Sequence, residues 1–299
     1  MRKYGVFALT ILVIAFSGLA NAAAVITSDN PYIQYTGRID FFDVMTPILG
    51  WPGGHIMVKF EGSSVKATME NLSDGDGVIY FNAIIDDGDP ILLDFPNGTS
   101  TRTIATGLSD GVHKLLLFKR TEHYDGTITF LGLELDEGKG LLEPPDRPGL
   151  KIEFYGDSIT VGLALDAPTN EGGNIYTNNY LAYGAQTARN LDAEYHCQAI
   201  SGIGLVGGWG QMSDFWDRTN PADASSTWVF SQWVPDVIVQ NLGQNDSWQS
   251  TPTAAEAIQG YVDYVKMYRK VYGLDVHIVL ALGSMAATQV GSPWPGYIE

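Results

Sequence analysis

Cysteine is almost absent from this chain of 299 residues, in which Cys197 is the only one. A single thiol cannot form an intrachain disulfide, and it cannot supply a zinc site built from cysteines. Cys197 lies in an apolar, strand-like stretch, so we interpret it as a small core residue. We predict no metal and no cofactor.

Basic residues are also scarce, with 17 Lys and Arg against 34 Asp and Glu and a formal net charge of −17. An acidic surface of this kind repels phosphates, which argues against nucleic acid or an anionic membrane as a partner. A neutral partner such as a polysaccharide remains compatible with this charge. The charge alone could equally serve only solubility.

Long apolar runs are missing except at the start, where Phe7 to Leu19 follows Arg2 and Lys3. Ala20-Asn21-Ala22 then fits a cleavage site with small residues at its first and third positions, so we predict a signal peptide over residues 1–22. The alternative is a membrane anchor, but the run is shorter than the ~20 residues that a spanning helix needs. We therefore expect a secreted protein, extracellular or periplasmic, with no membrane contact after cleavage.

Residues 25–136 lack amphipathic helical spacing. Short β-rich runs such as Ile56 to Phe60 and Lys114 to Phe118 alternate with turn clusters such as Asp86 to Asp89. This pattern is typical of an all-β sandwich or jelly roll. Residues 137–150 are rich in proline and glycine, and we interpret them as a linker.

From residue 151 onward strands alternate with helices, which predicts an α/β domain over residues 151–299 with a parallel sheet flanked by helices. The expected strands cover 151–155, 194–200, 236–241 and 275–282, and the expected helices cover 180–190 and 254–271. We expect the second helix to bury an apolar stripe made of Ile258, Tyr261, Val262, Val265 and Tyr268.

Polar residues and glycines follow three of these strands. Ligands bind beyond the carboxyl ends of strands in an open α/β sheet, so these positions are candidates for a site. Ser158 follows the first strand at a helix start, Gly202 follows the second, and Asn245 follows the third. Taken singly, each residue also has a purely structural explanation. Ser158 could be a helix cap, Gly202 a turn glycine, and Asn245 the start of a turn after the strand.

Taken together, the three segments resemble the signature blocks of SGNH (GDSL-type) hydrolases. These blocks are Phe154-Tyr155-Gly156-Asp157-Ser158-Ile159-Thr160, then Ser201-Gly202, then Gly243-Gln244-Asn245-Asp246. The β-rich region resembles carbohydrate esterase family 2 at Tyr35-Thr36-Gly37-Arg38, Val58-Lys59-Phe60-Glu61-Gly62 and Lys119-Arg120-Thr121-Glu122. The likeness runs from about residue 33 to the end, and it implies a jelly roll joined to a flavodoxin-like SGNH domain.

The resemblance implies a role for each matched position. Ser158 would be the nucleophile, and the Ser158 N–H, the Gly202 N–H and the Asn245 side chain would form the oxyanion hole. Gly204 would replace Gly202 if the second block aligned two residues later. Asp157 and Asp246 would be supporting residues that fix the turns. Trp209 and Trp248 are the candidates for a platform that binds a sugar ring.

The family's fourth element is a histidine near the C-terminus, often with an aspartate two or three residues before it, and no such motif stands before Glu299. His196 lies about six residues before the Ser201-Gly202 turn and His277 lies about six before Gly283, so each is on the order of 20 Å from the catalytic edge. The other three histidines, His55, His113 and His123, fall in the β-rich region. We therefore expect a chain cut off before its catalytic base and inactive as it stands. A natural inactive relative is the alternative.

The implied function is an O-acetyl esterase that uses a serine acyl-enzyme to deacetylate plant polysaccharides or oligosaccharides, such as acetylated xylan or glucomannan. Two alternatives stay open at this point. One is a non-catalytic carbohydrate-binding relative, and the other is an SGNH lipase or thioesterase. An open site rimmed by tryptophan and tyrosine would favour a sugar, whereas a long apolar cleft would favour a lipid.

Overall fold

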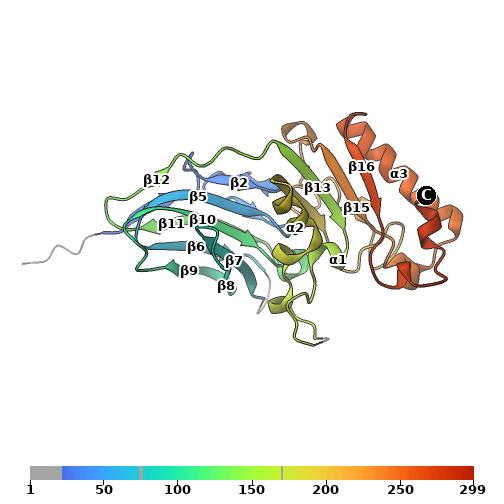
Figure 1. The fold of residues 1–299 in the computed structure, drawn as a ribbon, viewed down its shortest axis with the longest axis horizontal. Coiled ribbons are helices and arrows are strands. Elements are labelled where there is room, and N and C mark those ends of the chain that lie inside the picture. The colour runs from blue at the N-terminus through green and yellow to red at the C-terminus, as the bar shows by residue number, and fades with distance from the viewer. Residues whose placement is uncertain (1–21, 74–76, 170) are drawn as a thin grey trace, which may run out of the picture.

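The structure is a computed structural model that describes residues 22–73, 77–169 and 171–299. Figure 1 shows antiparallel strands gathered at one end of the molecule and parallel strands with the longest helix at the other. The expected all-β part followed by an α/β part is confirmed at this level. Of the predicted signal peptide, residues 1–22, only the last residue, Ala22, is described, and residues 1–21 lie outside the described residues.

Two antiparallel sheets make up the β part. The first has the order β3-β4-β11-β6-β9 with β1 on β11, and the second has the order β12-β5-β10-β7-β8 with β2 on β5. The strand bounds are β1 Ala24–Thr27, β2 Gln34–Thr36, β3 Ile39–Asp40, β4 Ile48–Leu49, β5 His55–Gly62, β6 Val65–Asn71, β7 Ile79–Ile85, β8 Ile91–Phe95, β9 Gly98–Ala105, β10 Gly111–Lys119, β11 Ile128–Leu135 and β12 Leu141–Leu142.

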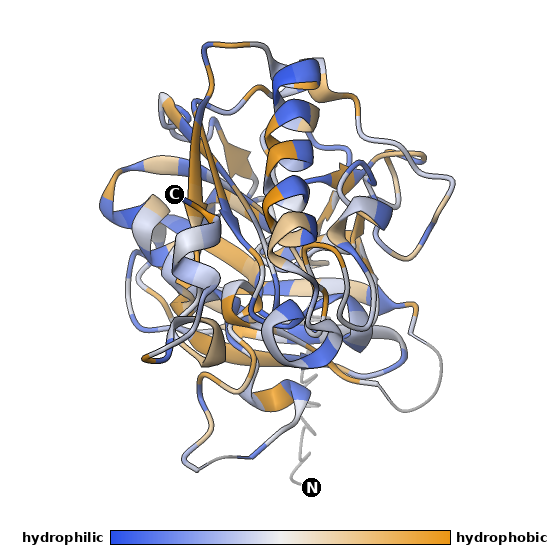
Figure 2. Ribbon diagram, turned by 90° about the vertical axis from the view of Figure 1, so that its right-hand side faces the viewer, coloured by the Kyte–Doolittle hydropathy of each residue, from blue (hydrophilic) through white to orange (hydrophobic). Residues whose placement is uncertain are grey.

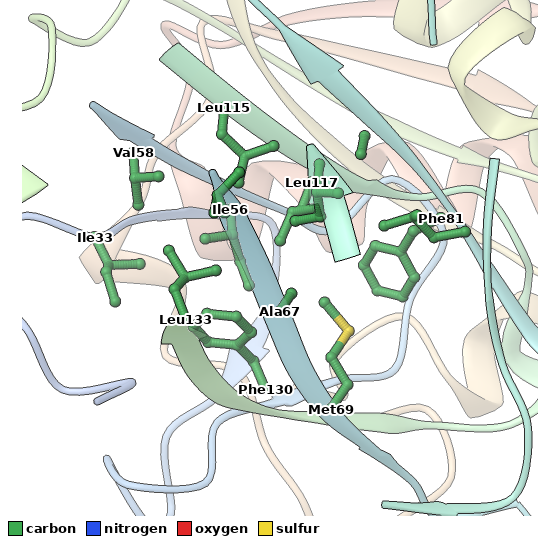
Figure 3. Packing of buried hydrophobic residues seen from close by; sticks show 14 of the residues in the cluster. Ile33, Ile56, Val58, Ala67, Met69, Phe81, Leu115, Leu117, Phe130 and Leu133 are labelled. Atoms are coloured by element: carbon green, nitrogen blue, oxygen red, sulfur yellow. The ribbon is translucent and has the colours of Figure 1, made fainter. Parts of the chain in front are cut away.

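The core of the β part lies between these sheets. In β6, Val65, Ala67 and Met69 are buried and alternate with partly exposed residues, as the two-residue period of a strand requires. Figure 3 shows Ala67 and Met69 among buried side chains of β5, β7, β10 and β11, including Ile56 and Phe130. This sheet-on-sheet packing agrees with the all-β sandwich predicted from the short strands and turn clusters, while the jelly-roll connectivity stays a prediction.

The α/β part is a four-stranded parallel sheet. Its strands are β13 (Leu150–Gly156), β14 (Ala193–Ala199), β15 (Val237–Asn241) and β16 (His277–Ala281), in the order β14-β13-β15-β16. The helices are α1 (Ser158–Val161), α2 (Tyr183–Asn190) and α3 (Ala254–Tyr272). Residues of α2 pack with Phe154 on one face of the sheet, and residues of α3 pack with Tyr155 on the other.

The apolar stripe predicted for α3 is partly wrong. Tyr261 and Tyr268 are buried as expected, but Ile258 and Val262 are 44% and 39% exposed. The buried face instead runs through small and aromatic residues, Ala257, Gly260, Tyr261, Tyr264, Tyr268 and Tyr272. Figure 2 shows hydrophobic and hydrophilic residues alternating around this helix. Gly260 allows close approach, because a Cβ there would press on Leu205 and Val206.

Strand bounds in the α/β part differ from the expected ones by one or two residues, and two segments differ more. The helix expected over 180–190 begins at Tyr183, after a 3-10 turn over Asn179–Leu181. The segment 137–150 is not wholly irregular, since β12 pairs with β5 through Leu141 and Phe60. This connector, residues 137–150, therefore follows the edge of the β part before β13 begins. The domain limits predicted from the sequence stay a prediction.

Buried arginines join the two parts. Arg38, next to β3, donates to a Glu153 carboxylate oxygen of β13 at 2.9 Å, and neither side chain is exposed. Arg120 comes directly after β10 and donates to the carbonyls of Thr177 and Ile175 and to the carboxylate of Asp166. Charged hydrogen bonds of this kind fix the orientation of one part against the other.

The described ranges hold neither a candidate membrane span nor a candidate metal cluster. No helix in residues 22–73, 77–169 and 171–299 has the length and apolar character of a membrane span. Within those same residues, His, Cys, Asp and Glu form no cluster of three or more suited to a metal ion.

Candidate active site

Three loops meet at one edge of the parallel sheet. Gly156, the last residue of β13, is the register partner of Ala199 at the end of β14 and of Asn241 at the end of β15. Ser158 follows Gly156 by two residues. Gly202 follows Ala199 by three, and Asn245 follows Asn241 by four. The structure therefore places all three predicted oxyanion-hole residues at the same carboxyl edge.

Ser158 is the first residue of α1, a single helical turn. Asp157 caps this turn, because its Oδ1 accepts the Ile159 N–H at 3.0 Å. Ser158 itself is half-buried. In the described part of the chain, neither its N–H nor its Oγ has a hydrogen-bond partner. A free hydroxyl beside a free N–H at a helix start is suited to attack a carbonyl and to bind the oxygen anion that results.

The conformation of Gly202 is fixed by a backbone hydrogen bond from Trp209. Its φ is +80°, a left-handed conformation that glycine adopts without strain, and its carbonyl accepts the Trp209 N–H at 3.0 Å. The Gly202 N–H has no partner among the described residues. The fallback residue differs, since the Gly204 N–H already donates to the Gly210 carbonyl at 2.9 Å. The geometry thus favours Gly202 over Gly204 as an oxyanion donor.

We expect Gly202→Ala to lower the free energy of unfolding by about 1–3 kcal/mol, because alanine is strained at positive φ and its Cβ would collide with the Trp209 indole. Urea unfolding followed by tryptophan fluorescence measures this. Gly210→Ala in the same loop is the control, since nothing lies within 4 Å of a Cβ there. Equal loss in both variants would contradict the steric account.

Asn245 joins the second and third loops. Its side-chain Nδ2 donates to the Ile203 carbonyl at 2.8 Å and makes a longer contact, 3.4 Å, to Asp157 Oδ2. The longer contact is the weaker one, so the N–H facing Asp157 is the one that a substrate oxygen could take over. Asp246, the next residue, accepts the Leu205 and Val206 N–H groups at 2.7 and 2.9 Å.

Burial dominates the electrostatics of the first loop. It raises the pKa of Asp157 to about 7, and the nearby carboxylate of Asp246 adds to the rise. The hydrogen bond from Ile159 acts in the opposite direction. Asp157 is therefore poised to lose its charge near neutral pH, which weakens its attraction for the Asn245 amide.

Two exposed tryptophans border the three loops. Trp209 is 75% exposed, although its ring lies against Gly202. Trp248 is 58% exposed and belongs to the turn Asp246–Ser250 that follows Asn245. Exposed indole rings beside a reacting centre suit the stacking of a sugar ring, which is the role predicted for both from the sequence.

No histidine of the described chain hydrogen-bonds to Ser158. His123 belongs to the β-rich region, yet its neighbour Glu122 reaches the second loop. The His123 ring contacts Tyr124 and Phe215, and burial lowers its pKa to about 4. The remaining histidines are engaged or placed elsewhere: His55 with Gly53, His113 with Asp86, His196 stacked on Trp233, and His277 at the start of β16.

Sequence reasoning missed Glu122 as a residue of this site. Its carboxylate accepts two hydrogen bonds from Ser201, the residue before Gly202. The segment Lys119 to Glu122 was noted only as part of a family resemblance. The available signal was a run of four polar residues that begins at the last residue of the apolar strand β10.

A family model supports the resemblance. The model described as "Carbohydrate esterase 2 N-terminal" matches residues 35–145. The chain is 37% identical over 267 residues to cellulase/esterase CelE of Acetivibrio thermocellus, which covers 86% of the chain. The chain spans about a third of that relative's length, 32%. It is 28% identical over 256 residues to an acetylxylan esterase / glucomannan deacetylase of Cellvibrio japonicus, covering 83% of the chain and 70% of the relative.

A solved structure is also similar over nearly the whole chain. It is a family two carbohydrate esterase from Clostridium thermocellum in complex with cellohexaose. The TM-score is 0.82 at 33% sequence identity, with 89% of this chain and 82% of the other covered. Both parts of the fold and their order are thus shared with that enzyme.

Proposed function

The chain belongs to carbohydrate esterase family 2, and from that premise we propose that it carries the serine site of a carbohydrate O-acetyl esterase. The observation that carries the proposal is the pair of free N–H groups of Ser158 and Gly202 at one sheet edge, beside the free Ser158 hydroxyl. Preorganised donors of this kind are the main requirement for acyl transfer.

In the proposed reaction, Ser158 Oγ attacks the acetyl carbonyl carbon, and the carbonyl electrons move to the oxygen. The N–H groups of Ser158 and Gly202 stabilise this oxygen anion, with Asn245 as the third donor. The C–O bond to the sugar then breaks, and the sugar oxygen takes up the proton that Ser158 lost. Water next releases acetate from the acetyl-serine and restores the hydroxyl.

The substrates that we propose are acetylated plant polysaccharides or their oligosaccharides, such as xylan or glucomannan. The printed names of the curated relatives support this class. So do Trp209 and Trp248, which offer exposed rings beside the site. We also propose that residues 1–22 export the chain, because these substrates lie outside the cell.

We propose that the base is a histidine encoded after Glu299, so that residues 23–299 are nearly inactive by themselves. Without a base the Ser158 hydroxyl is a weak nucleophile at neutral pH. We expect the chain extended by the residues that its reading frame encodes after Glu299 to release acetate from 4-nitrophenyl acetate and acetylated xylan. We expect residues 23–299 to be at least about 10³-fold slower.

The comparison needs both proteins folded, which circular dichroism and gel filtration check before the assay. Comparable activity in both forms, lost in Ser158→Ala, would show that a base lies within residues 23–299. An extended protein that is folded but releases no acetate would overturn the esterase proposal.

A non-catalytic carbohydrate-binding role is the second candidate. The lack of a histidine partner for Ser158 in the described chain favours it, as does the exposed Trp209 ring. The similar structure from Clostridium thermocellum was solved with cellohexaose bound. Calorimetric titration of residues 23–299 with cellohexaose distinguishes this role: saturable binding that falls in Trp209→Ala, together with an inactive extended chain, would support it.

A further inference from the structure

One carboxylate crosses from the β part into the α/β part directly behind the candidate oxyanion hole. Glu122 lies three residues after β10, and its Oε2 accepts the Ser201 N–H at 2.8 Å. Its Oε1 accepts the Ser201 hydroxyl at 2.6 Å. Glu122 is only 4% exposed, so these two hydrogen bonds are shielded from water.

The backbone of Glu122 is itself held in place. Its N–H donates to Asp125 Oδ2 at 3.1 Å, and its carbonyl accepts from the buried Lys119 Nζ at 3.2 Å. Lys119 also binds the Thr121 carbonyl at 2.9 Å. Glu122 therefore reaches Ser201 from a rigid segment, not from a loose loop.

The contact bears on the direction of the Gly202 N–H. That N–H belongs to the peptide between Ser201 and Gly202, so its direction is set by the backbone dihedrals of Ser201. Glu122 fixes Ser201 at both its N–H and its side chain, and Trp209 fixes the next peptide through the Gly202 carbonyl. The free N–H thus lies between two anchored peptides.

The charge of Glu122 argues that its role is geometric. A negative charge near a developing oxygen anion opposes its formation, and burial already raises the pKa of Glu122 above its usual range. What Glu122 supplies despite these costs is two hydrogen bonds to one serine, from the Ser201 N–H and from the Ser201 hydroxyl.

We propose that Glu122 is a positioning residue for the oxyanion loop, so that the β part completes the site of the α/β part. The role in catalysis rests on the proposed function, whereas the anchoring of the loop does not. The two are therefore tested separately.

The anchoring is tested by amide hydrogen exchange on residues 23–299. We expect Glu122→Ala to raise the exchange rate of the Ser201 amide at least about 10-fold, because its acceptor is lost, and to leave the Ile159 amide unchanged. Gln34→Ala is the matched control, since it removes another contact of the β part, to the Pro145 carbonyl. An unchanged Ser201 rate in folded Glu122→Ala would overturn the proposal.

The catalytic consequence is tested by kinetics on the extended chain. Removing one oxyanion donor costs about 10²–10³ in kcat, so misdirecting one is expected to cost about 10–100-fold in Glu122→Ala with KM within about 3-fold. Glu122→Gln should stay within about 3-fold of the parent, because its amide oxygen can accept the Ser201 N–H while its NH₂ donates to the hydroxyl. A loss in Glu122→Gln as large as in Glu122→Ala would overturn the geometric role.

Ser201→Ala tests the same contact from its other side if Glu122→Ala does not fold. It removes one of the two hydrogen bonds, so we expect a smaller fall in kcat, about 3–10-fold, and little further loss when it is combined with Glu122→Gln. If the fall in kcat of the double variant equalled the product of the falls in the two single variants, Glu122 and Ser201 would act independently, and a shared role would be contradicted. An inactive extended parent with the expected exchange behaviour would refute the proposed function and leave the anchoring standing.

Discussion

Replacing Ser158 with alanine in the extended chain is expected to lower kcat for acetate release by at least about 10⁴-fold. The reason is that the hydroxyl forms the covalent intermediate and nothing else in the site can replace it. The residual rate should come from the N–H groups of Ser158 and Gly202, which the substitution leaves in place. KM should change little, because the substitution leaves the exposed Trp209 and Trp248 rings in place.

The measurement is the initial rate on 4-nitrophenyl acetate and on acetylated xylan at equal concentrations of folded protein. Ser225→Ala is a suitable control, because the Ser225 hydroxyl contacts only the Asp223 carboxylate in the described chain. Activity that survives Ser158→Ala would remove Ser158 as the nucleophile, whatever the outcome for Glu122.

The Arg38→Met variant is expected to lose about 3–5 kcal/mol of unfolding free energy. Arg38 and Glu153 form an ion pair of 2.9 Å with both side chains fully buried. Removal of the guanidinium leaves the carboxylate in the interior with the Tyr272 hydroxyl, at 2.7 Å, as its remaining donor. An uncompensated buried charge carries a penalty of this size.

Urea unfolding of residues 23–299, followed by tryptophan fluorescence, measures the loss. Adding Glu153→Gln to Arg38→Met should recover at least about half of it, because the orphaned charge is then gone. Lys66→Met is the control, since the exposed Lys66–Glu134 pair should contribute about 1 kcal/mol or less. A similar loss from Lys66→Met, or no recovery in the double variant, would contradict the burial argument.

The strand-end residues were predictable because they follow from local patterns. Runs of five to eight residues mark the strands, and parallel strands bring their carboxyl ends to one edge. Ser158, Gly202 and Asn245 could therefore be placed together without knowing any contact between them. The runs Ile56 to Phe60 and Lys114 to Phe118 were equally local signals, and both lie within strands of the structure, β5 and β10.

The contacts between the two parts were not predictable in this way. Arg38 meets Glu153 across 115 positions of sequence, and Glu122 meets Ser201 across 79. Hydrophobic periodicity carries no information on such pairs, because it describes a face and not its partner. The face of α3 was misjudged for a related reason: close packing on Leu205 favours the small Gly260, whereas a hydrophobicity scale favours Ile258.

The course of the connector limits how freely this protein can be taken apart and recombined. After β12 pairs with β5, the Gln34 side chain binds the Pro145 carbonyl at 2.6 Å, and Arg147 binds the Tyr35 carbonyl at 2.8 Å. These contacts hold the connector, residues 137–150, against the β part up to the start of β13 at Leu150. Inserting or deleting a residue here would move the β part relative to the α/β part, and the hydrogen bonds between Glu122 and Ser201 would be lost. The two halves are thus poor candidates for exchange as separate modules.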